Sequence, residues 1–296
     1  MVAAAIPWQS VEGQSSFPLS DLMPVVRGGG LGNQLMAGDL LAAGVDPTVA
    51  RGDRVGVEVA GGSHVLDLSW GSAGVRFNAL GRACAIVFAS LSYGEQTRTG
   101  FDDRLGIFGG EFTPSDWNLA LATILLEEES LIIGAGTTLS HAQLDEASAF
   151  GLSAAVAVRK RFDNLEIRGG ISNIGTVIRP FLKDDGTKLP ARIRVGGAYL
   201  LTNRNVEISA ETLYRLGDNN TGWGAGAEWS PVPRAALRIG LTGGDGGSHL
   251  SDNIMSDLGL TVGFAWKFSE WRLSYQYRPG GIWGDGHLIA AGWNLD

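Results

Sequence analysis

Many short stretches of this chain alternate apolar and polar residues with a period of two. In 271–278 the odd positions are Trp, Leu, Tyr and Tyr, and the even positions are Arg, Ser, Gln and Arg. Twelve or more stretches follow such a pattern. Because successive side chains of a β-strand point to opposite faces, each stretch predicts a strand with one apolar and one polar face.

The alternation predicts an all-β chain from residue 54 onward. At most sixteen strands fit, and merging of neighbouring short segments makes 14 the expected number. The segments are 54–60, 64–70, 73–80, 83–94, 104–112, 117–126, 130–141, 149–161, 164–173, 191–201, 205–215, 222–230, 234–242, 257–268, 270–279 and 286–295.

The length and number of these strands favour a membrane barrel over a sandwich. Many run about 9–13 residues, which matches the tilted span of a bilayer, whereas sandwich strands average five or six. Short links alternate with the longer links 95–103, 174–190 and 243–256, as in barrels with tight turns at one rim and external loops at the other. We therefore expect an antiparallel up-and-down transmembrane β-barrel. A soluble sandwich or a lipid-carrying barrel is the alternative.

Composition narrows the class of partner and the location. The net charge of −8 and the lack of a basic stripe argue against nucleic acid. Cys84 is the single cysteine, so neither an internal disulfide nor a cysteine metal cluster is expected. No apolar run reaches the length of a spanning helix, and the first residues do not resemble a signal peptide. We expect the mature form of a protein of the bacterial outer membrane, in contact with its lipid.

Residues 1–50 differ from the rest, so we divide the chain into this segment, in or near the lumen, and a barrel over 51–296. The stretch 17–26 is irregular. Gly28 to Gly32 is glycine-rich and predicts a flexible hinge rather than a phosphate loop, because no Lys-Ser/Thr follows. Gln34 to Val45 is mildly amphipathic and predicts a short helix, and Asp46-Pro47 then breaks the chain.

One parity of the strands carries charge and is expected to line the lumen. Its members are Asp67, Glu166, Arg168, Arg192, Arg194, Glu207, Glu211, Glu228, Arg238, Lys267, Arg272 and Arg278. Five acids and seven bases form a mixed set, whereas a selective pore lines its constriction with one sign. Paired networks in a filled or gated lumen are therefore favoured, with an open passage as the alternative.

The opposite parity is expected to face lipid, with aromatic residues near strand ends forming a girdle. The expected membrane-facing aromatic residues are Trp223, Trp229, Phe264, Trp266, Phe268, Trp271, Tyr275, Tyr277 and Trp293.

Several motifs resemble those of the PorV/PorQ family of outer-membrane proteins, relatives of the FadL-like fatty-acid transporters. They are the stretch from Leu189-Pro190 to Ala198-Tyr199, the strand ending in Asn173-Ile174-Gly175, Phe112 to Asp116, and Tyr275 to His287. The resemblance covers roughly 104–296. It implies a 14-stranded barrel with an N-terminal segment in or near the lumen.

The resemblance also implies a function without catalysis. PorV-like members are associated with type IX secretion and accept secreted cargo, which implies docking to another protein of an export or surface-attachment complex. FadL-like relatives pass hydrophobic molecules, so a hydrophobic transporter is the alternative. A small diffusion porin is the third.

Neither an enzyme site nor a metal or other cofactor is predicted from the residues. Ser140 and His141 are neighbours in one strand and point to opposite faces, so they cannot form a nucleophile–base pair. The histidines lack the spacing of a zinc site. The acidic loops Asp184-Asp185, Asp218 and Asp245-Gly246 fit polar turns, with calcium binding as the less favoured interpretation.

Overall fold

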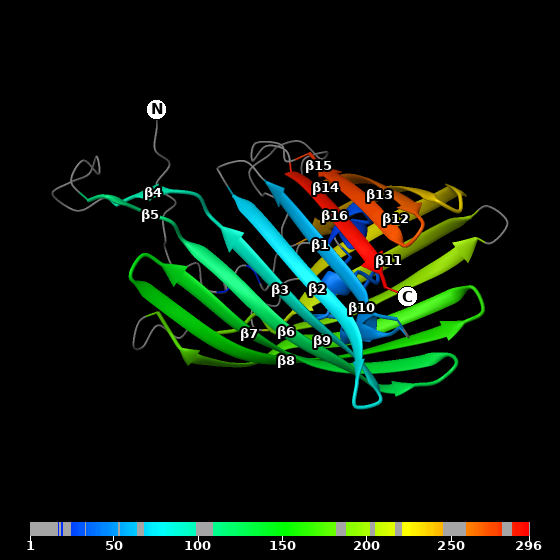
Figure 1. Cartoon of the computed structure of the whole chain (residues 1–296), viewed down its shortest axis with the longest axis horizontal. Coiled ribbons are helices and arrows are strands. Elements are labelled where there is room, and N and C mark those ends of the chain that lie inside the picture. Colours follow the sequence, from blue (N-terminus) through cyan, green and yellow to red (C-terminus); the bar gives the residue numbers. More distant parts are fainter. Residues whose placement is uncertain are drawn as a thin grey trace.

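The fold is described from a computed structural model of the chain. It describes residues 17, 19, 25–32, 34–52, 54–63, 68–98, 109–181, 188–201, 205–216, 221–244, 259–279 and 286–295. Within these residues, fourteen strands form one closed antiparallel barrel (Figure 1). Each pairs with its neighbour in the chain, and the first and last close the ring. The predicted fold class and strand number are confirmed.

The barrel strands have the following bounds: β1 Gly56–Ser63, β2 Ser69–Ala79, β3 Arg82–Ser92, β6 Ser115–Glu127, β7 Leu131–Leu144, β8 Ala147–Phe162, β9 Leu165–Arg179, β10 Arg192–Leu201, β11 Val206–Arg215, β12 Thr221–Val232, β13 Ala235–Gly244, β14 Gly259–Phe268, β15 Trp271–Arg278 and β16 Gly286–Asn294. β1 closes on β16 from the pair Gly56↔Asn294 to the pair Ser63↔His287.

Three predicted segments differ from the strands of the structure in their bounds. The segments 64–70 and 73–80 merge, as the expected number of 14 strands allowed, since β2 runs through 69–79; residues 64–67 lie outside the described residues. Of the predicted strand 104–112, residues 104–108 lie outside the described residues, and within 109–112 Glu111–Phe112 (β5) is extended. β5 pairs with Gln96–Thr97 (β4) in a two-stranded sheet apart from the barrel. Alternation does not distinguish a barrel strand from an extended loop.

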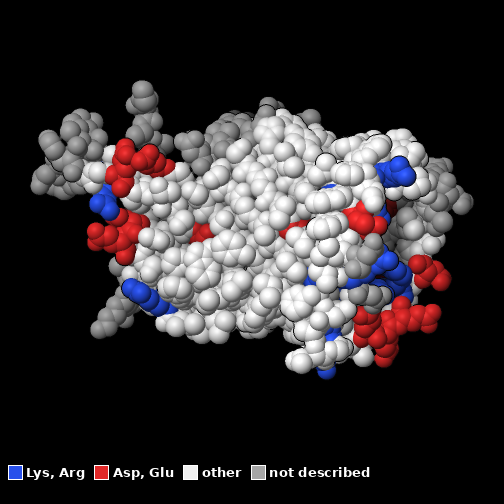
Figure 2. Space-filling model, in the orientation of Figure 1, with Lys and Arg blue, Asp and Glu red and all other residues white. Residues whose placement is uncertain are grey.

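The outer surface is apolar because the outward parity of the strands is apolar. Large outward side chains such as Ile239, 53% exposed, and Val195, 51% exposed, have no protein layer over them. Charged side chains gather at the two ends of the face in Figure 2, and few lie in the band between. Such a belt is stable only in lipid, where a closed sheet leaves no backbone edge to satisfy.

The two rims differ in the lengths of their connections. At one rim, called here the turn rim, the links 80–81, 128–130, 163–164, 202–205, 233–234 and 269–270 have two to four residues. β1 starts and β16 ends at this rim. At the other, the loop rim, the links are 64–68, 93–114, 145–146, 180–191, 216–220, 245–258 and 279–285. In outer-membrane barrels the short turns face the periplasm.

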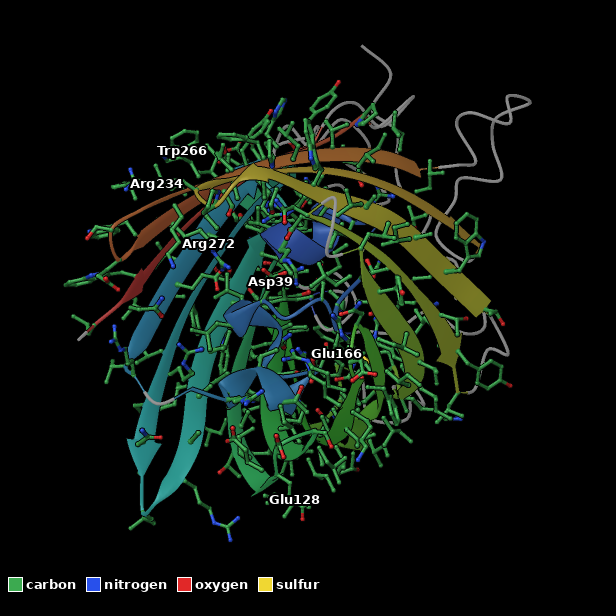
Figure 3. All side chains as sticks on the ribbon, turned by 90° about the vertical axis from the view of Figure 1, so that its right-hand side faces the viewer. Asp39, Glu128, Glu166, Arg234, Trp266 and Arg272 are labelled. Atoms are coloured by element: carbon green, nitrogen blue, oxygen red, sulfur yellow. The ribbon has the colours of Figure 1, made fainter. Side chains whose placement is uncertain are left out.

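Residues 25–50 lie inside the barrel, and we call them the plug (Figure 3, blue ribbon). The plug contains one α-helix, α1 Val26–Gly30, and two 3₁₀ turns, η2 Leu40–Ala42 and η3 Pro47–Ala50. Among the described residues, no helix is long and apolar enough to cross a bilayer. Whether the boundary lies at residue 50 stays a prediction, because residues 1–16 are not described.

Two of three local predictions for this segment are wrong. The glycine run is a helix, α1, whose Gly28, Gly29 and Gly30 are buried against the wall. A helix over 34–45 does not form, and only η2 coils there. The predicted break at Asp46-Pro47 is confirmed, since Asp46 is not helical; it caps η3 by accepting from Thr48 N, with Pro47 in the first turn.

Candidate functional site

The plug contacts strands around most of the circumference of the barrel. α1 packs on β13, β14, β15 and β16; η2 packs on β1, β2 and β3; η3 packs on β3, β6, β7 and β8. Between α1 and η2 the chain meets β9 and β11 through the backbone of Met36. The lumen is therefore crossed by an ordered segment, as the mixed charge of its lining favours.

Apolar packing holds the half of the plug next to β1–β7. Leu41, Val45 and Val49 share one buried cluster with small side chains of the wall, including Ala85 and Ala120. Small residues on the inner face let the plug approach closely, which is why this buried cluster can form inside a barrel.

Asp39 holds the start of α1. Its carboxylate accepts from the backbone N–H of Gly28 at 2.8 Å and of Arg27 at 3.3 Å. These groups have no partner inside the helix, and the N-cap residue Val25 supplies no side-chain bond. Asp39, which lies eleven residues after Gly28, thus takes the place of a local cap. Its carboxylate also joins the start of α1 to the segment before η2.

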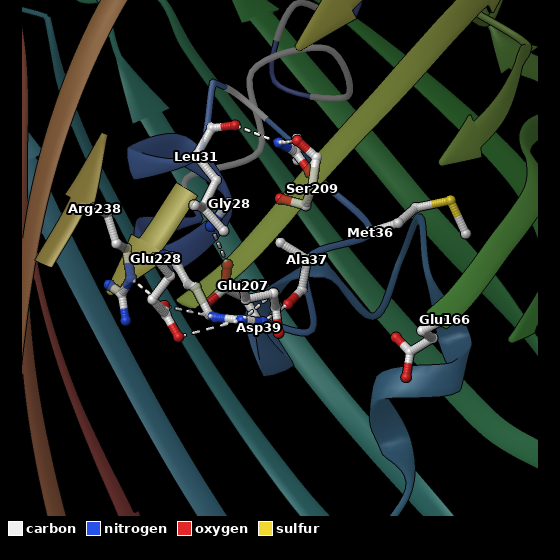
Figure 4. A network of polar contacts seen from close by, with 12 residues as sticks. Gly28, Leu31, Met36, Ala37, Asp39, Glu166, Glu207, Ser209, Glu228 and Arg238 are labelled. Carbon is white, nitrogen blue, oxygen red and sulfur yellow. Dashed lines mark hydrogen bonds and ion pairs between the residues drawn. The ribbon is translucent and has the colours of Figure 1, made fainter. Parts of the chain in front are cut away.

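Arg27 joins the plug to β11 and β12. Its Nη2 donates to Glu207 at 2.7 Å and its Nε donates to Glu228 at 3.1 Å, while Nη1 donates to the carbonyl of Ala37 (Figure 4). Arg238 on β13 donates to Glu228 at 2.6 Å. Burial alone would lower the pKa of Arg27, but the carboxylates of Glu228 and Glu207 outweigh it and raise this pKa.

A second ionic network joins the plug to β8 and β9. Arg159 donates to Asp46 at 2.8 Å and lies 3.4 Å from Glu166. Glu166 also accepts from Arg168 at 2.7 Å, and Arg168 donates to the carbonyl of Met36 at 2.7 Å. Met36 and Asp46 of the plug are therefore both bonded to one connected set of wall residues.

Two further carboxylates bind plug backbone. Glu211 accepts from Met36 N at 2.9 Å and from Arg194 at 2.8 Å. Glu58 accepts from Leu40 N at 3.3 Å and from Arg272 at 3.2 Å. Because each acid also contacts an arginine of the wall, its buried charge is compensated.

Inward-facing glycines of the wall make room for the plug backbone. A Cβ at Gly224 would lie 2.0 Å from the carbonyl oxygen of Gly32, and a Cβ at Gly240 would lie 2.0 Å from Gly32 N. Gly32 itself has φ +82°, which a residue with a side chain rarely adopts. Part of the high glycine content therefore serves contact between the wall and the plug.

An interruption of the wall lies between β9 and β10. Their pairing stops at Ser172↔Arg192, whereas β9 continues to Arg179 with β8 as its neighbour. Within the described part of the chain, no strand pairs with the other edge of residues 174–179. Two outward side chains of this stretch are apolar, Ile174, 46% exposed, and Ile178, 61% exposed.

A kink in β9 starts where the interruption starts. Asn173 has φ +57°, and the β8–β9 register shifts between Ala154 and Val156. Two residues of β9 thus oppose one of β8, which is the geometry of a β-bulge and turns the strand locally. The side chain of Asn173 donates to the carbonyl of Pro190 at 3.3 Å.

A small apolar cluster lies inside the barrel beside this interruption. It contains Phe17, which precedes the plug, with inward Ala142 of β7, Ala149 of β8 and Val177 of β9, and with Phe181 and Leu189 of the link 180–191. Phe17 is 1% exposed. Apolar side chains therefore line the inner side of the region where β9 leaves β10.

The residues predicted to line the lumen lie as follows. Glu166, Arg168, Arg194, Glu211, Arg238, Glu207, Glu228 and Arg272 take part in the ion pairs above. Arg192 is buried at the loop-rim end of β10, and Arg278 is half-buried at the end of β15. Lys267 is exposed and lines a cavity near the turn rim. Asp67 lies outside the described residues.

The predicted membrane-facing aromatic residues lie on the outward parity. Trp223, Trp229, Phe264, Trp266, Phe268, Trp271, Tyr275 and Trp293 are exposed, while Tyr277 is partly buried. Trp271 and Trp293 stack with ring centroids 5.1 Å apart. In Figure 3, Trp266 points outward, whereas Asp39 lies in the interior.

Five charged residues of the lumen were missed by sequence reasoning. Glu58 and Arg159 lie on the inward parity of β1 and β8, so the alternation of these strands could have predicted that they face the lumen. Arg27, Asp39 and Asp46 belong to the plug, which has no period from which direction can be inferred.

Other candidate motifs lie apart from the lumen. Ser140 is buried on the inner face, while His141 stacks on Trp117 with ring centroids 5.2 Å apart, so the two side chains point apart as predicted. The acidic loops at Asp184, Asp218 and Asp245 lie outside the described residues.

Comparison with known proteins gives a fold but no family. No protein-family model and no curated protein sequence matches the chain. Among solved structures, the TodX deltaS2S3 mutant monoaromatic hydrocarbon channel has 12% identity over 96% of this chain and 99% of that chain, with a TM-score of 0.59. A TodX deltaS2 mutant has 11% identity over 86% and 94%, with a TM-score of 0.57.

This chain is a bacterial outer-membrane β-barrel. The closed sheet, the apolar outer belt and the likeness to membrane channels agree on this architecture. At 12% identity the likeness concerns the fold alone.

Proposed function

We propose that the protein lets small hydrophobic molecules pass through the outer membrane, with access from lipid between β9 and β10. One observation carries the proposal. The β9–β10 pairing ends at Ser172 while β9 runs on, and the apolar cluster of Phe17, Val177 and Leu189 lies behind that place. An apolar solute dissolved in the membrane would reach this cluster without crossing the charged rims.

The architecture supports transport without catalysis. The same fold forms the TodX monoaromatic hydrocarbon channel, whose mutants this chain resembles in structure. The plug crosses the barrel axis and is held by several ion pairs, which weighs against a porin that is simply open to water. Passage then requires the plug to shift.

Docking to an export or surface-attachment partner is the second candidate. The length of the links 93–114, 180–191 and 245–258 at the loop rim favours it, because long connections often carry binding residues. The PorV/PorQ resemblance in the sequence points the same way.

Uptake of a labelled hydrophobic solute separates these candidates. Cells lacking their own hydrophobic channels would take up radiolabelled toluene faster when they express the protein. Val177→Asp introduces a charge into the apolar cluster and is expected to reduce the rate at least about tenfold, equivalent to about 1.4 kcal/mol. Val177→Leu keeps the cluster apolar and should retain uptake.

A uniform rate with all variants and with an empty vector would refute transport. Recovery of one protein partner from detergent extracts would then support docking. The heat-sensitive mobility of the folded barrel on gels shows that each variant has folded.

A further inference from the structure

A cavity of about 160 Å³ lies inside the barrel near the turn rim, between β12 and β15. Five basic residues line it, Arg27, Arg234, Arg238, Lys267 and Arg272, and Glu228 is its acid. An adjoining cavity of about 320 Å³ shares Glu228, Ser230 and Pro233 with it. Bases therefore outnumber acids in the lining of the first cavity.

Three of these bases, Arg27, Arg238 and Arg272, are already bonded to acids. Arg27 uses Nε and Nη2 on Glu228 and Glu207. Arg272 binds Glu58 through Nη2. Glu228 in turn receives both Arg27 and Arg238, so the one acid of the cavity is compensated.

Three donor groups remain without an acid. Nη1 of Arg238 is buried and has no hydrogen-bond partner, and the whole residue is 6% exposed. Arg234 and Lys267 form no ion pair within the described part of the chain. A buried guanidinium nitrogen without an acceptor costs free energy that an anion in the cavity would recover.

We infer that this cavity binds a phosphate group reaching the barrel from the turn rim. A phosphate group presents three oxygens and up to two charges, so it can accept from Arg238, Lys267 and Arg234 together. A carboxylate offers two oxygens and one charge. The volume corresponds to about five water molecules at about 30 Å³ each, which suits a compact group.

Binding is measured by titration calorimetry on the whole purified barrel in a phosphate-free maltoside detergent. Inorganic phosphate tests a free source, and short-chain phosphatidylglycerol tests a lipid headgroup. We expect saturable binding of at least one of the two, and the tighter one identifies the source. Absence of saturable binding with both would overturn the inference.

Variants locate the site without removing a buried pair. Lys267→Gln combined with Arg234→Gln should weaken phosphate binding at least about tenfold. Arg82→Gln, an exposed arginine beyond the cavity on the same rim, should leave it unchanged. Equal affinity in all three proteins, or acetate binding as tightly as phosphate, would contradict the assignment.

Arg238→Lys gives a further check, because the ammonium can keep the contact with Glu228 but removes the free Nη1. Weaker phosphate binding with unchanged thermal stability supports a ligand role for Arg238, whereas unchanged binding argues against one.

Discussion

The carboxylate of Asp46 is fully buried and lies 2.8 Å from the guanidinium of Arg159, 113 residues further along the chain. This pair joins the plug to the barrel wall, and Arg159 extends it to Glu166. A single network therefore connects the first turn after η2 with strands β8 and β9. The plug is part of the folded barrel, and its displacement requires buried ion pairs to open.

A charge in the outer belt should destabilise the barrel. Ile239 lies in the middle of β13 and is 53% exposed to the surroundings of the barrel. Ile239→Arg is expected to lower the free energy of unfolding by about 2–4 kcal/mol, because the charge faces hydrocarbon. Urea unfolding in lipid vesicles measures it. Leu80→Arg, in a turn where Leu80 is 103% exposed, should change stability by less than about 0.5 kcal/mol.

Removal of the Arg27 charge should loosen the plug. Arg27→Gln leaves Glu207 and Glu228 partly uncompensated, and breaking a fully buried pair costs about 3–5 kcal/mol. These side chains are 15–25% exposed, so we expect a smaller cost of about 2 kcal/mol and a higher single-channel conductance. Planar bilayer recording measures the conductance.

The matched control for that prediction is Arg51→Gln. Arg51 pairs with Glu127, but both side chains are more than 40% exposed. The expected loss is below about 1 kcal/mol, without a change in conductance. Equal conductance for both variants would contradict the prediction that the ion pairs of Arg27 hold the plug in place.

A methyl group on the wall should displace the plug. Gly240→Ala places a Cβ 2.0 Å from Gly32 N, a backbone atom that cannot rotate away. We expect proteolysis of the plug in detergent to become faster while the barrel strands stay protected. Gly169→Ala is the control, since the nearest atom to its Cβ would be 3.9 Å away. Unchanged proteolysis of Gly240→Ala would refute close contact.

At the kink in β9, we expect glycine to be more stable than alanine at position 173. Asn173 has φ +57°, where a side chain other than Asn or Asp costs roughly 1–2 kcal/mol. Asn173→Ala and Asn173→Gly both lose the bond to Pro190, so their difference isolates the backbone term. The alanine variant is expected to be less stable by about 1 kcal/mol in urea unfolding. Equal stability would mean that this residue relaxes to an extended conformation.

Alternation alone predicted the barrel strands and the direction of their side chains. Residues such as Arg194 and Glu211 could be placed in the lumen because a strand's period is two and does not depend on distant contacts. Alternation did not predict which charged residues form ion pairs with each other. Arg194 pairs with Glu211 across β10 and β11, but Glu207 pairs with Arg27 of the plug.

The sequence by itself therefore determined an antiparallel membrane barrel, its expected number of strands and the two faces of its wall. Only the tertiary structure decided that residues 25–50 fill the lumen, that the glycine run forms α1, and that β9 parts from β10 after Ser172. The physical reason is the separation in sequence of the residues that interact. Strand faces follow from neighbouring residues, whereas the plug contacts and the interrupted ladder arise only when the sheet has closed around a segment far away in sequence.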